Sequence, residues 1–181
     1  MPINASDTAF MLVATALVLL MTPGLAFFYG GLIGRKSVSA IMMQSFVSLG
    51  ITTVLWVVVG YSLCFGSDIG GVIGNPADFF LLKGIGVADI YEGLEIPVYL
   101  FVAYQLMFAV ITPALMTGAF ASRVSFPPYL AFIVVWVLFV YCPVCHWVWG
   151  QNGFLKDWGV LDFAGGLVVH TTAGFGALAS V

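Results

Sequence analysis

The sequence predicts an all-α protein, a polytopic transmembrane helical bundle with five spans, and three observations support this prediction. Of its 181 residues, 62% are hydrophobic and only 7% are charged, whereas soluble domains average about 25% charged residues. The charged residues are confined to short segments that separate five long uncharged runs. Apolar residues are continuous within each run rather than alternating, which favours membrane helices over the strands of a barrel.

The same composition excludes several classes of function. Too few polar side chains are present to cover the surface of a soluble enzyme, so no enzymatic activity is expected. Five Lys and Arg residues against eight Asp and Glu residues leave no cationic face for phosphates, so no nucleic acid is expected as a partner. The remaining medium for this chain is the lipid bilayer.

The first two helices are expected near residues 8–33 and 38–65. The first uncharged run lies between Asp7 and Arg35, and the second follows Lys36. Both runs exceed the roughly 20 apolar residues that cross the hydrocarbon core. The chain before the first run lacks the basic start of a signal peptide, so we expect this helix to belong to the mature protein.

The other three helices are expected near residues 97–121, 127–148 and 162–181, after a glycine-rich loop over residues 66–96. Prolines open the third and fourth helices, where the missing N–H group costs nothing. The fifth uncharged run only just reaches the length of a membrane span. It ends the chain without a charged flank, so the sequence is expected to be half of a larger protein.

The basic residues predict the orientation of the bundle. Arg35, Lys36 and Arg123 lie in two loops on one side, and neither loop contains an acidic residue. Seven acidic residues lie in the segments of the other side. The excess of positive charge in cytoplasmic loops therefore places the amino terminus outside, in a multi-pass protein of the cell (plasma) membrane.

Two ionisable residues in the last expected helix are candidates for function, because such groups are costly inside a membrane. His170 lies eight residues after Asp162, about 12 Å along a helix, and is expected near the bilayer midplane. It suits either a narrow polar pathway or a structural hydrogen bond between helices. Asp162 suits either an N-cap or a carboxylate that attracts a cation to an outer mouth.

Aromatic residues and one cysteine motif give weaker signals. Trp149 is expected at the outer boundary, where tryptophan belongs to the aromatic belt or offers a face to a cation. Phe108 alone is an ordinary core aromatic. The string from Cys142 to His146 reads CPVCH, the pattern of covalent haem attachment. A membrane haem protein, with His146 alone or paired with His170, is therefore one alternative, although the string lies at a hydrophobic helix end.

Four segments resemble signatures of the ammonium transporter family (Amt/MEP/Rh). The first helix contains MTPGLAFFYGGLIGRKSV, the third contains YQLMFAVITPALMTGAFASRVSF, the fourth ends in HWVWG, and the fifth begins with DFAGGLVVHTTAG. They occur in the order and spacing of the family, and the resemblance covers essentially the whole chain. The proline and histidine of CPVCH are common in the family, which argues against haem attachment.

The resemblance implies a fold of eleven helices, in which residues 1–181 form the first of two five-helix inverted repeats. It implies a homotrimer with one pore in each protomer and no cofactor or metal. Ammonium or ammonia would be the substrate, with methylammonium as an analogue, and a PII-type signalling protein would be a partner on the cytoplasmic side. An ammonium-sensing input domain is the alternative within this family.

Roles for five residues follow from the resemblance. Trp149 and Phe108 match an outer recruitment site, where an ammonium ion meets aromatic faces, and Tyr104 matches a neighbouring aromatic position. Asp162 matches an acidic residue that shapes this site, and His170 matches the first of two pore histidines that ammonia passes. The second histidine belongs to the other repeat, so this chain alone is not expected to conduct.

Overall fold

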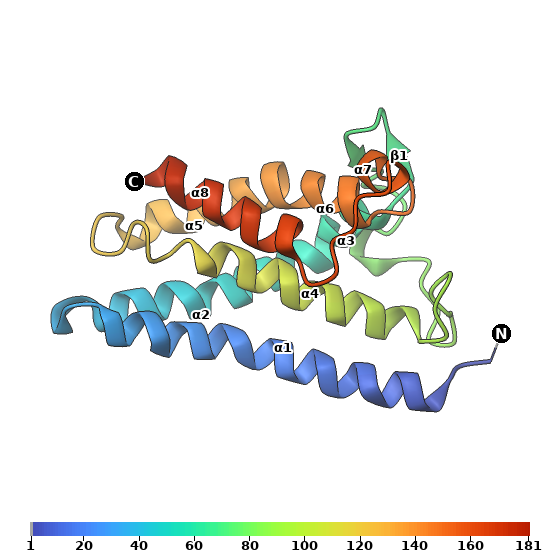
Figure 1. The fold of residues 1–181 in the computed structure, drawn as a ribbon, viewed down its shortest axis with the longest axis horizontal. Coiled ribbons are helices and arrows are strands. Elements are labelled where there is room, and N and C mark those ends of the chain that lie inside the picture. Colours follow the sequence, from blue (N-terminus) through green and yellow to red (C-terminus); the bar gives the residue numbers. More distant parts are fainter. Residues whose placement is uncertain (1) are drawn as a thin grey trace.

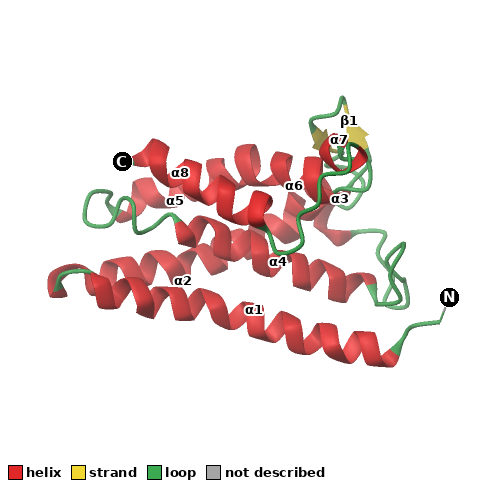
Figure 2. Cartoon of the chain, viewed as in Figure 1, coloured by secondary structure: helices red, strands yellow, loops and turns green. Residues whose placement is uncertain are grey.

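Five helical segments, joined by loops and one small hairpin, make up the part of the chain that the computed structural model describes, residues 2–181 (Figures 1 and 2). Two of these segments contain a π-helical turn between α-helical parts, and the last segment begins with one. The helices and strands, in order, are α1 (Ala5–Leu32), α2 (Val38–Leu55), α3 (Tyr61–Phe65), β1 (Asp68–Ile69), β2 (Ile73–Gly74), α4 (Val98–Leu115), α5 (Phe126–Trp136), α6 (Cys142–Trp149), α7 (Phe154–Asp157) and α8 (Thr172–Ser180).

The first two segments lie close to their expected positions. Helix α1 is capped by Asn4, whose side-chain oxygen accepts hydrogen bonds from the N–H groups of Ser6 and Asp7, as a good N-cap does. Helices α2 and α3 are joined by the π-helical turn Trp56–Gly60. They therefore form one unbroken helix over the expected residues, 38–65.

The third segment, α4, ends at Leu115, six residues before the expected end at 121. The Tyr29 hydroxyl donates a hydrogen bond of 2.8 Å to the Leu115 carbonyl, so this carbonyl has a partner outside the helix. The backbone then turns, and a Cβ atom at Gly118 would lie 3.1 Å from the Tyr29 ring. The end of α4 is therefore packed against α1, and the sequence around residue 115 does not show this contact.

The fourth and fifth segments each contain a π-helical turn, inside the fourth segment and at the start of the fifth. Helices α5 and α6 are joined by the π-helical turn Val137–Tyr141 and form one helix over 126–149. The fifth segment starts with a π-helical turn at Gly166–Thr171, four residues after the expected start at 162. It starts late because Gly165 has a left-handed backbone, with φ of 74°, and helical geometry begins only after it.

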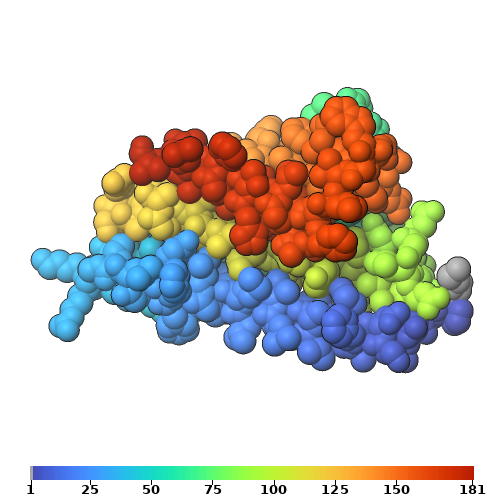
Figure 3. Space-filling view, viewed as in Figure 1, coloured from blue at the N-terminus to red at the C-terminus, as the bar shows by residue number. Residues whose placement is uncertain are grey.

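The long loop contains a two-stranded hairpin that we did not predict. Strands β1 and β2 pair antiparallel, with Asp68 opposite Gly74. The loop lies at the same end of the bundle as the amino terminus, whereas the carboxyl terminus lies at the opposite end (Figure 1). We call the first end the hairpin end. In the space-filling view, α1 (blue) and the carboxyl-terminal segment (red and orange) form opposite edges of the molecule (Figure 3).

The long helices fit a membrane in length and composition. Four of them, within the described residues, are long and apolar enough to span a bilayer: Ala5–Leu32, Arg35–Phe65, Val98–Leu115 and a stretch over Phe126–Asp157. Within an apolar stretch of 18 residues, 61% of the residues of α4 are buried inside the bundle, but only 11% of those of α1. Helix α4 therefore forms the centre of a polytopic membrane-spanning bundle, and α1 exposes apolar side chains at its edge.

Candidate functional site

A cavity of about 480 Å³ opens at the hairpin end of α4. Four of the five predicted site residues line it: Tyr104, Phe108, Trp149 and Asp162. They come from three parts of the chain, namely α4, the end of α6 and the segment before α8. The bundle thus brings together side chains that lie up to 58 positions apart in the sequence.

Three aromatic rings form one wall of this cavity. The ring centroids of Tyr104 and Phe108 lie 5.0 Å apart at an interplanar angle of 84°. Those of Phe108 and Trp149 lie 5.7 Å apart at 68°. Such edge-to-face pairs are favoured by the ring quadrupoles. The faces of electron-rich rings attract a cation that has lost part of its hydration shell.

Asp162 holds the start of the last helix and the Trp149 ring in place. Its carboxylate oxygen Oδ2 accepts hydrogen bonds from the N–H groups of Leu167 at 3.0 Å and Val168 at 2.9 Å. Its backbone carbonyl accepts a bond of 3.2 Å from the Trp149 indole Nε1. The side chain thus satisfies N–H groups at a helix start, and Asp162 is also one of the residues that line the cavity.

His170 lies one helical turn beyond the cavity and is exposed in this chain. Its Nδ1 atom is 3.0 Å from the Gly165 carbonyl. Because a carbonyl only accepts hydrogen bonds, Nδ1 carries the hydrogen, and the neutral ring then presents Nε2 as an acceptor. His170 does not line the cavity itself, but Gly165 does, so one hydrogen bond links the imidazole to the cavity wall.

The sequence reasoning missed the other residues of the cavity lining, and four of these are polar or charged: Tyr91, Glu92, Gln105 and Lys156. Gln105 has a buried Oε1 atom without a hydrogen-bond partner among the described residues. The sequence could have indicated Gln105, because it is one of only two glutamines within the expected helices. Tyr91 and Glu92 come from the long loop, where no pattern marks them. Tyr91 stacks on Phe101 with ring centroids 3.6 Å apart, and burial raises its pKa to about 12.

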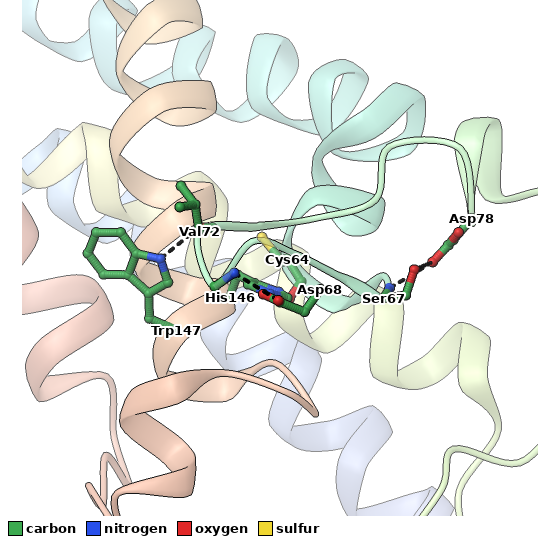
Figure 4. Close-up of polar contacts among 8 residues, drawn as sticks. Cys64, Ser67, Asp68, Val72, Asp78, His146 and Trp147 are labelled. Atoms are coloured by element: carbon green, nitrogen blue, oxygen red, sulfur yellow. Dashed lines mark hydrogen bonds and ion pairs between the residues drawn. The ribbon is translucent and has the colours of Figure 1, made fainter.

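The CPVCH string does not fit covalent haem attachment. The side chains of Cys142 and Cys145 are completely buried, so neither thiol can reach a haem edge. Both ring nitrogens of His146 already have partners, the Cys64 carbonyl and the Asp68 carboxylate, each at 3.0 Å (Figure 4). Among residues 2–181, no group of three or more His, Cys, Asp and Glu side chains could hold a metal ion.

The apolar bundle, with a cavity lined by aromatic and charged residues at one end, is that of a polytopic membrane protein. Residues 9–181 match the sequence profile of the Ammonium Transporter Family. This match covers nearly the whole chain, and the chain belongs to this family, whose members are transporters rather than enzymes.

Curated relatives and solved structures agree with this assignment. An ammonium transporter of Mycobacterium tuberculosis (strain H37Rv) is 47% identical over 197 residues, which cover 97% of this chain and 41% of that protein. A putative ammonium transporter of Methanothermobacter thermautotrophicus is 50% identical, with 99% and 44% covered. The crystal structure of Candida albicans Mep2 superposes with a TM-score of 0.86 at 36% identity, covering 98% of this chain and 38% of that one. The chain therefore spans less than half the length of the relatives it matches.

Proposed function

We propose that this chain forms the amino-terminal half of an ammonium pathway, in which the cavity recruits NH4+ and the imidazole of His170 passes ammonia onward. The observation that carries this proposal is the joint placement of two aromatic rings, Phe108 and Trp149, and the carboxylate of Asp162 around one cavity. Aromatic faces and a carboxylate favour a small cation. Family membership supports the substrate.

The arrangement beyond the cavity favours ammonia over a bare cation. A cation that leaves water for a hydrocarbon interior pays a very large desolvation penalty, whereas neutral ammonia does not. The free Nε2 acceptor of His170 accepts an N–H bond from ammonia. Potassium has no proton to lose, so a pathway that passes the neutral molecule excludes it. We propose that the proton leaves ammonium at or near the cavity.

We further propose that the hairpin end faces the outside of the cell membrane. Arg35, Lys36 and Arg123 all lie at the opposite end of the bundle, which the distribution of basic residues places in the cytoplasm. A PII-type signalling protein would then bind at that opposite end. The homotrimer implied by the family resemblance needs further apolar contact surface, and α1 exposes such side chains, Leu17 and Phe27 among them.

The recruitment role is tested by replacing Trp149 in a transport-competent protein. We define the joined protein as this chain followed by the remaining carboxyl-terminal part of the Methanothermobacter thermautotrophicus relative. Trp149→Leu is expected to lower kcat/KM for methylammonium uptake into liposomes about 2- to 30-fold, the factor that corresponds to the loss of one cation–π contact.

Trp158→Leu is the matched control, because Trp158 is 76% exposed and does not line the cavity. Its uptake is expected to equal that of the unsubstituted joined protein. Equal uptake by Trp149→Leu and Trp158→Leu would contradict the recruitment role.

An ammonium-sensing function is the second candidate. A structure titled Sensor Amt Protein superposes with a TM-score of 0.86 at 29% identity, covering 96% of this chain and 42% of that one. A sensor and a transporter share the recruitment cavity in this proposal, and they differ in flux. Saturable ammonium binding by the joined protein, without uptake, would favour the sensor.

A further inference from the structure

His146 is a buried histidine with two hydrogen-bond partners at the hairpin end. It lies in the last turn of α6, and its side chain is about 1% exposed. Its Nδ1 atom is 3.0 Å from the carbonyl oxygen of Cys64 in α3, and its Nε2 atom is 3.0 Å from Oδ1 of Asp68 in β1. Figure 4 shows the ring between these two partners, at the base of the hairpin.

Both partners of His146 are oxygen atoms. The Cys64 carbonyl only accepts hydrogen bonds, and so does an ionised carboxylate. Asp68 is ionised, because the hydrogen bonds from His146 and from the Gly71 N–H group lower the pKa of its carboxyl. Both ring nitrogens can donate to these acceptors only if the ring is a doubly protonated imidazolium. The carboxyl-terminal ends of α3 and α6 also favour a positive charge there.

The imidazole connects three elements by hydrogen bonds: α6, α3 and the hairpin. It joins α6 to α3 through Cys64 and to the hairpin through Asp68. A second bond, 2.7 Å from Trp147 Nε1 to the Val72 carbonyl, fastens the hairpin to the same turn of α6 (Figure 4). Two hydrogen bonds therefore hold the hairpin to the end of α6, one at Asp68 and one at Val72.

The chain beyond α6 folds back directly over the imidazole. A Cβ atom at Gly150 would lie 2.9 Å from Nδ1 of His146 and 3.0 Å from the Cys64 carbonyl oxygen. A methyl group therefore does not fit at this position. Trp149 lies between His146 and this turn, and its indole reaches across to the Asp162 carbonyl. A displacement of the imidazole therefore moves the backbone that carries the Trp149 ring.

We propose that His146 is a positioning residue of the recruitment cavity: as an imidazolium it fastens α3, the hairpin and the end of α6 together, and so holds Trp149 against Phe108 and Asp162. The inference rests on the proposed function only in calling this cavity a recruitment site. The protonation state and the mobility of Trp149 are measurable on the chain itself, so their outcome does not depend on whether ammonium is the substrate.

The protonation state is tested by NMR of the 181-residue chain in lipid nanodiscs, with nitrogen-15 in both histidines. His170→Asn assigns the signals. We expect both nitrogens of His146 to carry hydrogen at neutral pH. In Asp68→Asn, the amide NH2 group can donate to Nε2, so His146 is expected to lose one hydrogen and become neutral. A His146 with one unprotonated nitrogen in the unsubstituted chain would overturn the proposal.

The positioning role is tested by hydrogen exchange of the Trp149 indole N–H group in the same samples. Asp68→Ala changes an exposed residue and removes the hydrogen-bond partner of His146 Nε2. This substitution is expected to speed the exchange of the Trp149 indole about tenfold, the factor for the loss of one charge-assisted hydrogen bond. His146→Gln is expected to act in the same direction. Asp68→Ala alone decides the test if His146→Gln does not fold.

Ser67→Ala is the matched control in the same loop. It removes the 2.6 Å bond between Ser67 Oγ and Asp78 but leaves the contacts of His146 intact. We expect the exchange of the Trp149 indole to be unchanged in this variant. Unchanged exchange in Asp68→Ala as well would overturn the positioning role of His146.

Discussion

At the residue scale, Asp162 serves the helix start and the cavity with different atoms. Its Oδ2 atom accepts two N–H groups of the last helix, and its carbonyl accepts the Trp149 indole. Asp162 is therefore both a structural cap, through its side chain, and a residue of the cavity lining. This double use makes substitutions at Asp162 informative.

Asp162→Ala is expected to lower the free energy of unfolding by about 0.5–2 kcal/mol, the range for a lost helix cap. Asp162→Asn keeps an oxygen that accepts these bonds, so most of this free energy is expected to remain. Unfolding of the chain in detergent, followed by circular dichroism, measures both. Asp157→Asn, an exposed neighbour in α7, serves as the control. Equal stability of Asp162→Ala and Asp157→Asn would contradict the cap.

The stability of the hairpin is expected to depend on acid through Asp68. Hydrogen bonds from His146 and Gly71 lower the pKa of this carboxyl below its ordinary value of 3.8. A carboxyl with a lowered folded-state pKa stabilises fully above its unfolded value, and this contribution is lost as the pH falls through the folded value. The hairpin should therefore loosen below about pH 3.8, and amide exchange at Gly71 reports it.

Asp68→Asn removes this titration, so the exchange at Gly71 should depend less on acid in this variant. The remaining dependence is expected to come from Asp78, whose pKa is lowered by hydrogen bonds from the Ser67 hydroxyl and N–H groups. An identical acid profile in the unsubstituted chain and in Asp68→Asn would show that Asp68 does not hold the hairpin.

Residue type predicted part of the site and left out the rest. Asp162 and His170 were found because ionisable groups are rare in uncharged runs. Phe108 and Tyr104 carry no such mark, and only the family resemblance selected them. The bonds of His146 to α3 and β1 join positions about 80 apart in the sequence, so no local pattern predicts them. Long-range contacts of this kind depend on the packed bundle.

At the element scale, the positions of charges and prolines predicted where helices lie, but not the end of α4 or the start of the last helix. Helix α4 stops at Leu115, and the Tyr29 hydroxyl of α1 donates a hydrogen bond to the Leu115 carbonyl. The last helix starts at Gly166 after a left-handed glycine. The π-helical turns and the hairpin also escaped prediction, since hydropathy responds to apolar length rather than to backbone geometry.

Packing of α8 depends on Gly176. A Cβ atom there would lie 2.5 Å from Met116 Sδ and 3.0 Å from Trp136 Nε1, and Met116 is fully buried. Gly176→Ala is therefore expected to destabilise the chain by about 1–3 kcal/mol, as overpacking does. Thermal unfolding in detergent measures this change.

Gly174→Ala is the matched control on the same helix. A Cβ atom at Gly174 meets nothing within 4 Å, and alanine favours a helix by up to about 1 kcal/mol over glycine. Equal or higher stability is expected for this variant. If the two variants unfolded alike, close packing of α8 against α4 and α5 would be refuted.

At the scale of the whole molecule, the last segment of the chain exposes large apolar side chains and His170. Phe163 is 93% exposed and Phe175 69% exposed, and His170, between them in the sequence, is also exposed. These residues flank the proposed pathway on one side only. The chain covers 41% of the length of its Mycobacterium tuberculosis relative, and we propose that a second repeat closes the other side.

The most direct test of this account is ammonium flux into proteoliposomes, compared for the 181-residue chain, the joined protein and its His170→Ala variant. We predict flux of ammonium and methylammonium, but not of potassium, through the joined protein, and no flux through the chain alone. His170→Ala is predicted to admit potassium or to lose ammonium flux. Selective flux through the chain alone, or unchanged selectivity in His170→Ala, would contradict the half-pathway with its histidine.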